Sequence, residues 1–254
     1  GDNYEMMVIF FLGGLTGAYV VKDTRTRGRL LYAGFLVSAV NVLCLFLFTP
    51  DWHVVLKSGY LKEQLYPLMA NGILASLFIA ATLKVFESLF RVLTNFSLLE
   101  LADFNQPLLK KLIIEAPGTY HHSMVVSNLA EAAADAIGAN GLLARVGAYY
   151  HDIGKMSHPE YFTENQLMGG NKHDDLEPNV SRLVILNHVK EGMELAKKYK
   201  LNQAIIDFIP QHHGTGLIYY FYQKTIEQSQ EGEEVLESNF RYPGPKPQTK
   251  ETAI

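Results

Sequence analysis

Three long stretches without a charged residue dominate the first part of the chain. They span residues 6–21, 30–48 and 65–83 and contain no Asp, Glu, Lys or Arg. A helix needs about 20 residues, within a range of about 17–25, to cross a bilayer, so two stretches are long enough and the first is slightly short. Helices of a soluble core normally carry a polar stripe, which these stretches lack. Residues 1–95 are therefore predicted to form a membrane region with three transmembrane helices.

The loops between these stretches differ in charge, and this difference predicts their orientation. Residues 22–29 contain four basic residues and one acidic residue, whereas residues 49–64 contain two of each. Loops rich in Lys and Arg tend to stay on the cytoplasmic side. After three crossings, everything beyond residue 84 is then expected in the cytoplasm. The sequence thus predicts a multi-pass protein of the cell membrane, with the lipid bilayer as a partner.

From about residue 96 onward, charges of both signs are frequent and apolar residues recur at helical spacing. Residues 96–116 are predicted as a linker helix that bends or restarts at Pro107. Residues 117–254 are predicted as an all-α domain in which Thr119 caps the first helix and Pro210 interrupts the fourth. The expected helices cover about residues 119–137, 142–151, 179–200, 202–213 and 217–226.

Composition and the chain ends bear on nucleic-acid binding, on disulfide formation and on whether the chain is a fragment. The net charge of -4 argues against a dedicated nucleic-acid surface. The single cysteine, Cys44, rules out an intrachain disulfide, which is compatible with a reducing compartment. The chain starts without Met and stops at Ile254 in what resembles the first turn of a helix. We therefore expect a fragment of a longer protein, with the last domain truncated at its C-terminus.

Several histidines in the polar part of the chain lie at inward-looking helix positions or helix ends. His151 and Asp152 end an apolar helix and precede Gly154, which is expected to let the chain turn. Burying such an ionisable pair costs free energy unless it is paired or metal-bound. The other histidines with apolar flanks or at an apolar helix end are His122, His188, His212 and His213. Five imidazoles and one carboxylate suit iron, manganese or zinc, and a shared carboxylate can hold two ions about 3.5–4 Å apart.

The remaining histidines are assigned no ligand role. His53, His158 and His173 lie in polar loops. His121 neighbours His122 but points about 100° away from it on a helix, so it is expected outside the ligand set.

Four strings of residues, in chain order, point to one family. They are Gly118-Thr119-Tyr120-His121-His122-Ser123, Tyr149-Tyr150-His151-Asp152-Ile153-Gly154-Lys155, Glu164-Asn165-Gln166 and Phe240-Arg241-Tyr242-Pro243-Gly244-Pro245-Lys246-Pro247. With the histidines above, they resemble the seven-transmembrane HD receptors of the HD phosphohydrolase superfamily. The resemblance is strong over about residues 84–254, and the three apolar stretches match the last spans of that family's membrane domain. It implies a cyclic di-AMP phosphodiesterase of bacterial second-messenger signalling, which yields linear pApA and is coupled to a membrane sensor region.

The resemblance also implies a ligand set for two divalent transition-metal ions, iron or manganese. One ion would be held by His122, His151 and Asp152. The second would be held by Asp152, His188, His212 and His213, with Asp152 bridging the two. The family pattern has a further aspartate soon after the Pro-rich segment, but no Asp follows Asp207 in this chain. That ligand is therefore expected beyond Ile254.

In the implied reaction, a hydroxide bound by both metals attacks the phosphodiester. Lys155 would stabilise the phosphate oxygens, and Arg241 and Lys246 are further candidates for phosphate contacts. The implied partners are a cyclic dinucleotide substrate, an upstream extracellular sensor domain of the same protein and a second copy in a homodimer.

Two alternatives stay open. The domain could hydrolyse cyclic di-GMP or another nucleotide, since Tyr242-Pro243 is similar to a motif of the cyclic di-GMP branch. Alternatively, it could be a non-catalytic nucleotide-binding membrane signalling domain.

Overall fold

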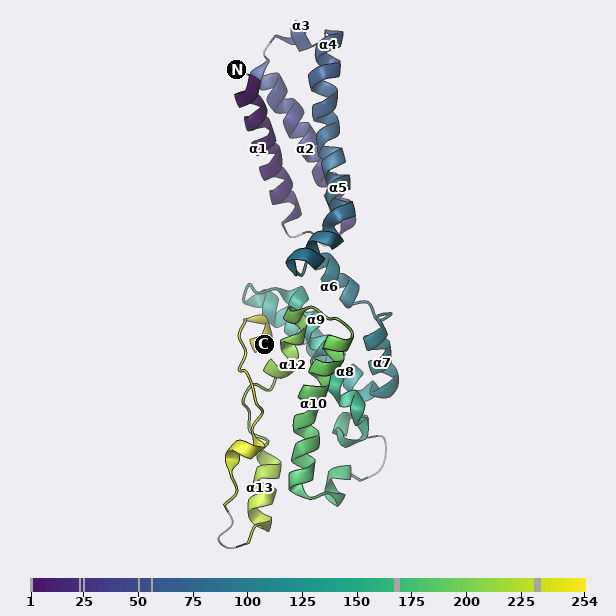
Figure 1. Ribbon diagram of the computed structural model, residues 1–254, viewed down its shortest axis with the longest axis vertical. Helices are drawn as coiled ribbons and strands as arrows, with labels where there is room; N and C mark the ends of the chain where they lie inside the picture. The colour runs from purple at the N-terminus through teal and green to yellow at the C-terminus, as the bar shows by residue number, and fades with distance from the viewer. Residues whose placement is uncertain are drawn as a thin grey trace. The chain divides into compact units, whose positions relative to one another are not determined.

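Helices form all the regular structure of the described part of the chain, apart from one isolated β-bridge between Leu217 and Arg241. The computed structural model describes residues 2–22, 24, 26–49, 51–55, 57–166, 170–230 and 234–254. It divides into two units, Gly1–Leu99 and Glu100–Ile254 (Figure 1). The prediction of an all-α chain is confirmed.

The first unit contains three long helices, α1 (Asp2–Val21), α2 (Arg27–Phe48) and α5 (Tyr66–Phe90). The short helices α3 (Trp52–Val55) and α4 (Ser58–Tyr60) and a π-helical segment, η1 (Leu61–Leu65), precede α5. Three segments are long and apolar enough to cross a membrane: Tyr4–Val21, Gly28–Phe48 and Leu61–Phe90. The third is longer than the predicted residues 65–83 at both ends.

Helix α2 packs against both α1 and α5. Its approach to α5 is close at Gly34 and Gly72, because a Cβ on Gly72 would lie only 2.3 Å from the Gly34 carbonyl oxygen. The two helices are also joined by a hydrogen bond of 3.3 Å from Asn41 Nδ2 to Asn71 Oδ1. Small residues and interhelical amide bonds are typical of helix packing in a bilayer.

The predicted linker consists of two helices, α6 (Asn95–Leu101) and α7 (Pro107–Glu115), so the chain restarts at Pro107 as expected. The longer helices of the second unit are α8 (Pro117–Ala136), α9 (Gly141–Tyr150), α10 (Pro178–Lys198) and α13 (Tyr219–Gln228). The two short helices α11 (Gln203–Ile206) and α12 (Phe208–Gln211) replace the single one predicted. The 3-10 turns are η2 (Ile153–Ser157), η3 (Pro159–Tyr161), η4 (Thr163–Asn165), η5 (Lys172–Asp175), η6 (Glu237–Phe240) and η7 (Glu251–Ala253).

Two local predictions were wrong. Thr119 does not cap α8, because Pro117 starts the helix at its favoured first position and Thr119 is fully buried inside the first turn. The helix predicted over residues 202–213 breaks at Asp207 and not at Pro210. Pro210 is the third residue of α12, where a backbone N–H has no partner within the helix, so its missing donor costs nothing there.

A fully buried core supports the end of α9, where the His-Asp pair lies. Tyr150 has no exposed surface, and its hydroxyl donates a hydrogen bond of 2.7 Å to the Leu101 carbonyl oxygen. Ile153, Ile205 and Ile209 are likewise fully buried. Because α9 ends against this core, the two residues that follow Tyr150 are held in the interior of the domain.

Candidate metal centre

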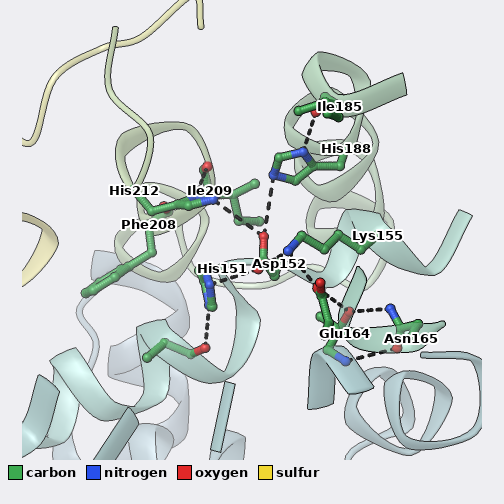
Figure 2. A network of polar contacts seen from close by, with 12 residues as sticks. His151, Asp152, Lys155, Glu164, Asn165, Ile185, His188, Phe208, Ile209 and His212 are labelled. Carbon is green, nitrogen blue, oxygen red and sulfur yellow. Dashed lines mark hydrogen bonds and ion pairs between the residues drawn. The ribbon is translucent and has the colours of Figure 1, made fainter. Parts of the chain in front are cut away.

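Asp152 is the centre of the candidate site, and its side chain is 3% exposed. Its Oδ2 atom lies 3.1 Å from His151 Nε2 and 2.9 Å from Lys155 Nζ. Its Oδ1 atom lies 3.4 Å from His188 Nε2 and 3.5 Å from His212 Nε2 (Figure 2). Helix α10 supplies His188, and the residue after α12 supplies His212. Segments far apart in the sequence therefore converge on one carboxylate.

The potential ligand atoms form two groups that share Asp152. Within each group, one atom from every member lies within 4.8 Å of the others. The first group is His122, His151 and Asp152, and the second is Asp152, His188, His212 and His213. The structure thus brings together every residue predicted as a metal ligand. Their role as ligands remains a prediction.

The backbone fixes which nitrogen of three histidines faces the site. Each Nδ1 contacts the carbonyl oxygen three residues earlier: His151 to Ala148 at 2.7 Å, His212 to Ile209 at 2.7 Å, and His188 to Ile185. A carbonyl oxygen only accepts, so Nδ1 carries the proton and a neutral ring turns an unprotonated Nε2 toward Asp152. Metal-binding histidines are held by the same kind of bond.

The result is a buried cluster of acceptors that lacks a donor. Asp152 Oδ1, His188 Nε2 and His212 Nε2 are buried and make no hydrogen bond within the described part of the chain. Acceptors that face one another at 3.4–3.5 Å are unfavourable unless a cation lies among them. Imidazole and carboxylate are also the ligands that divalent transition metals prefer. The residues therefore fit a metal ion.

Electrostatics favours the protonation states that bind metal. Burial lowers the pKa of His188 to about 4 and that of His213 to about 3. Burial also lowers the pKa of His122. Burial opposes ionisation of Asp152, but its neighbours, above all His151, outweigh this and hold its pKa well below the usual value. At neutral pH His122, His188 and His213 are thus neutral imidazoles beside a carboxylate, as metal coordination requires. Burial also lowers the pKa of His151, but the adjacent Asp152 outweighs this and raises it above the usual value, so a metal ion would have to displace a proton there.

An aromatic ring supports the second group. Tyr242 stacks on His213 with ring centroids 4.0 Å apart and an interplanar angle of 12°. The tyrosine is buried, and burial raises the pKa of its hydroxyl above the usual value. Its backbone N–H donates to the Gly216 carbonyl oxygen at 3.0 Å, which ties the Pro-rich segment to the turn after His213. Sequence reasoning noted Tyr242 only as part of a motif and missed this contact.

Lys155 is partly buried, with 14% of its side chain accessible. Its ammonium lies between Asp152 Oδ2 at 2.9 Å and Glu164 Oε1 at 2.8 Å. Lys155 therefore lies beside the candidate ligands, and its contact with phosphate stays a prediction. Glu164 was not predicted as a site residue, and its only signal was its place in one of the motif strings.

The weaker candidates for phosphate binding lie in different settings. The Arg241 guanidinium forms an ion pair with Glu237 and donates to the Thr215 carbonyl oxygen at 3.0 Å. Lys246 is exposed. Their phosphate contacts remain predictions.

His173 was expected in a polar loop, but the structure buries it. Its side chain is 6% exposed, and its Nε2 lies 2.9 Å from the Tyr161 carbonyl oxygen.

Residues 119–254, more than half of the chain, match the family model of the HD domain. The chain belongs to the HD domain family. Residues 1–94 match a second model, the 7TM receptor with intracellular HD hydrolase. Together with the three helices that are long and apolar enough to cross a bilayer, this match identifies a membrane protein. The resemblance seen in the sequence is thus confirmed.

Two similar proteins are both called Cyclic-di-AMP phosphodiesterase PgpH. That of Bacillus subtilis is 40% identical over 252 residues, covering 99% of this chain and 35% of the relative. That of Listeria monocytogenes is 46% identical over 248 residues, covering 97% and 34%. A crystal structure of the L. monocytogenes PgpH HD domain in complex with Cyclic-di-AMP is 58% identical, with a TM-score of 0.57, covering 59% of this chain and 69% of that one. This chain spans about a third of the length of these curated relatives.

Proposed function

We propose that the second unit of this chain hydrolyses cyclic di-AMP to linear pApA with two divalent transition-metal ions, iron or manganese. The observation that carries the proposal is the pair of ligand groups that share the buried Asp152. The substrate is supported by the 58% identical PgpH HD domain, whose structure contains cyclic di-AMP. The donor set of imidazoles and one carboxylate suits divalent transition metals, and the choice of iron or manganese among them rests on the family resemblance.

The residues have distinct proposed roles. One ion would be held by His122, His151 and Asp152, and the other by Asp152, His188, His212 and His213. When bound, two such ions supply a hydroxide nucleophile at neutral pH and neutralise phosphate charge. Lys155 would bind a non-bridging phosphate oxygen and stabilise the negative charge that develops in the transition state. Arg241 and Lys246 are further candidates for contacts with the substrate phosphates.

The test is metal content and hydrolysis, measured together on the full-length protein. We expect two iron or manganese ions per chain and conversion of cyclic di-AMP to pApA, with cyclic di-GMP hydrolysed less efficiently. If the protein contains two ions but hydrolyses only cyclic di-GMP or another nucleotide, the proposed substrate is wrong and the proposed metal site stands. Protein that binds cyclic di-AMP but contains no metal would contradict the proposal and favour a non-catalytic nucleotide-binding domain.

We further propose a membrane region over residues 1–95, a linker over 96–116 and the HD domain over 117–254, with the HD domain in the cytoplasm. The basic loop at residues 22–29 supports this orientation. Protease added to inside-out vesicles should cleave the HD domain, whereas protease outside intact cells should not. Cleavage in intact cells would contradict the orientation.

A further inference from the structure

Lys155 is held by two carboxylates that differ in kind. Asp152 is almost fully buried and shared by both candidate ligand groups, whereas the Glu164 side chain is 27% exposed and belongs to neither group. The Lys155 ammonium lies 2.9 Å from the first and 2.8 Å from the second. The ring of Phe162 lies beneath it, 4.9 Å from Nζ to the ring centroid. The lysine is thus fixed from three sides.

Glu164 is itself fixed to the start of α8. Its Oε1 accepts a hydrogen bond of 3.1 Å from Thr119 Oγ1. The next residue, Asn165, accepts from the Thr119 backbone N–H at 3.0 Å and donates to Thr119 Oγ1 at 2.8 Å (Figure 2). The two segments touch at Gly118, where a Cβ would lie 1.8 Å from the Glu164 carbonyl oxygen. The carboxylate of Glu164 therefore has a defined position, although it comes from the short turn η4.

The two carboxylates cannot serve Lys155 equally once a cation is bound. An Asp152 that coordinates cations has less negative charge to offer an ammonium, and the cations repel that ammonium over a few ångströms. Glu164 lies outside the ligand groups and keeps its full charge for Lys155. Without Glu164, the flexible lysine side chain would be free to swing away from the site.

We propose that Glu164 is a positioning residue that holds the Lys155 ammonium beside the metal centre, where it meets a phosphate oxygen of the substrate. This inference rests on the proposed function, because it assigns Lys155 to phosphate. Glu164 acts on the substrate only through Lys155. Its loss should therefore weaken both substrate binding and stabilisation of the transition state, and leave the metal ions in place.

The kinetic test compares full-length Glu164→Gln, Glu164→Asp, Lys155→Ala and the double variant Lys155→Ala/Glu164→Gln. Glu164→Gln should lower kcat/KM for cyclic di-AMP about tenfold, as expected for loss of one charged hydrogen bond, with metal content close to wild type. Glu164→Asp should recover part of this loss. The double variant should be no worse than Lys155→Ala alone, since the two residues act as a unit. Additive losses, or loss of metal in Glu164→Gln, would overturn the proposal.

A matched control comes from Glu160, a nearby acidic residue that pairs with Lys172 at 3.7 Å and not with Lys155. Glu160→Gln should leave kcat/KM unchanged. A second readout needs no turnover: acetylation of Lys155 by acetic anhydride, followed by mass spectrometry on metal-loaded protein. Acetylation of Lys155 should be several-fold faster in Glu164→Gln than in wild type or Glu160→Gln. An unchanged acetylation rate would overturn the proposed role of Glu164. If wild-type protein fails to cleave cyclic di-AMP, the proposed function fails. The acetylation rates still test whether Glu164 holds Lys155, because they do not depend on turnover.

Discussion

Gly154 is the position at which one added methyl group should disrupt the candidate metal centre. A Cβ there would lie 1.8 Å from the His188 carbonyl oxygen and 2.6 Å from the backbone nitrogen of Gly192. An ordinary carbon–oxygen contact is about 3.3 Å or longer, so η2 and α10 would have to separate by about 1.5 Å. Both obstacles are backbone atoms, so no side-chain rotation relieves the overlap.

This separation would move apart η2, which follows Asp152, and α10, which carries His188, so it would disturb the second ligand group. Asp152 precedes Gly154 by two residues, and its Oδ1 lies 3.4 Å from His188 Nε2. Metal sites tolerate errors of about 0.2 Å in ligand distance, so Gly154→Ala should lose most of its metal. Overpacking costs about 1–3 kcal/mol, and a rigid backbone contact places this substitution near 3 kcal/mol. For a domain of this size, such a loss lowers Tm by about 6–12 °C.

The assay is metal content of the purified full-length protein together with its thermal unfolding. The matched control is Gly170→Ala, because a Cβ at Gly170 would meet nothing within 4 Å. The control should keep both the metal and the wild-type Tm. A Gly154→Ala protein with wild-type metal content and wild-type Tm would refute the reasoning.

Two further substitutions separate the ligands from their support. Asp152→Ala should abolish turnover and lower the occupancy of both ions, because both groups contain this carboxylate; metal analysis that shows one full equivalent retained would argue against bridging. Tyr242→Leu should weaken metal binding about 10–100-fold by removing the ring stacked on His213, whereas Tyr242→Phe should stay near wild type. Equal metal affinities for the Leu and Phe variants, measured by competition with a chelator, would exclude a role for the stack.

The elements that the sequence predicted well are those set by local patterns. Uncharged apolar stretches and the restart at Pro107 depend on residues close together in the chain, and the structure has helices there. The ligand candidates could be found because burying His151 and Asp152 at the end of an apolar helix is costly without a partner. Chemistry therefore singled them out before their geometry was known.

The features that were missed depend on contacts between distant segments. Gly154 was expected to let the chain turn, but only Gly138, Gly214 and Gly244 have a positive φ among the described glycines. Gly154 is needed instead because α10 passes too close for a Cβ. Thr119 was predicted as a cap from its local position, yet its partners lie 45 and 46 residues away. No local periodicity encodes such pairs.

The three buried acceptor atoms beside one another lower the stability of the metal-free fold, and a bound metal ion should remove this penalty. Asp152 Oδ1, His188 Nε2 and His212 Nε2 are buried without hydrogen bonds in the described structure, and an unsatisfied buried polar atom costs about 1–3 kcal/mol. A cation among them offsets this cost, so chelation should lower the free energy of unfolding by about 3 kcal/mol or more. The measurement is thermal or denaturant unfolding before and after treatment with a chelator. Asp152→Ala, which lacks the shared ligand, should show little response. If chelation removes the metal but leaves wild-type unfolding unchanged, the fold satisfies these three atoms in some other way, and the argument that this cluster is built for a cation fails.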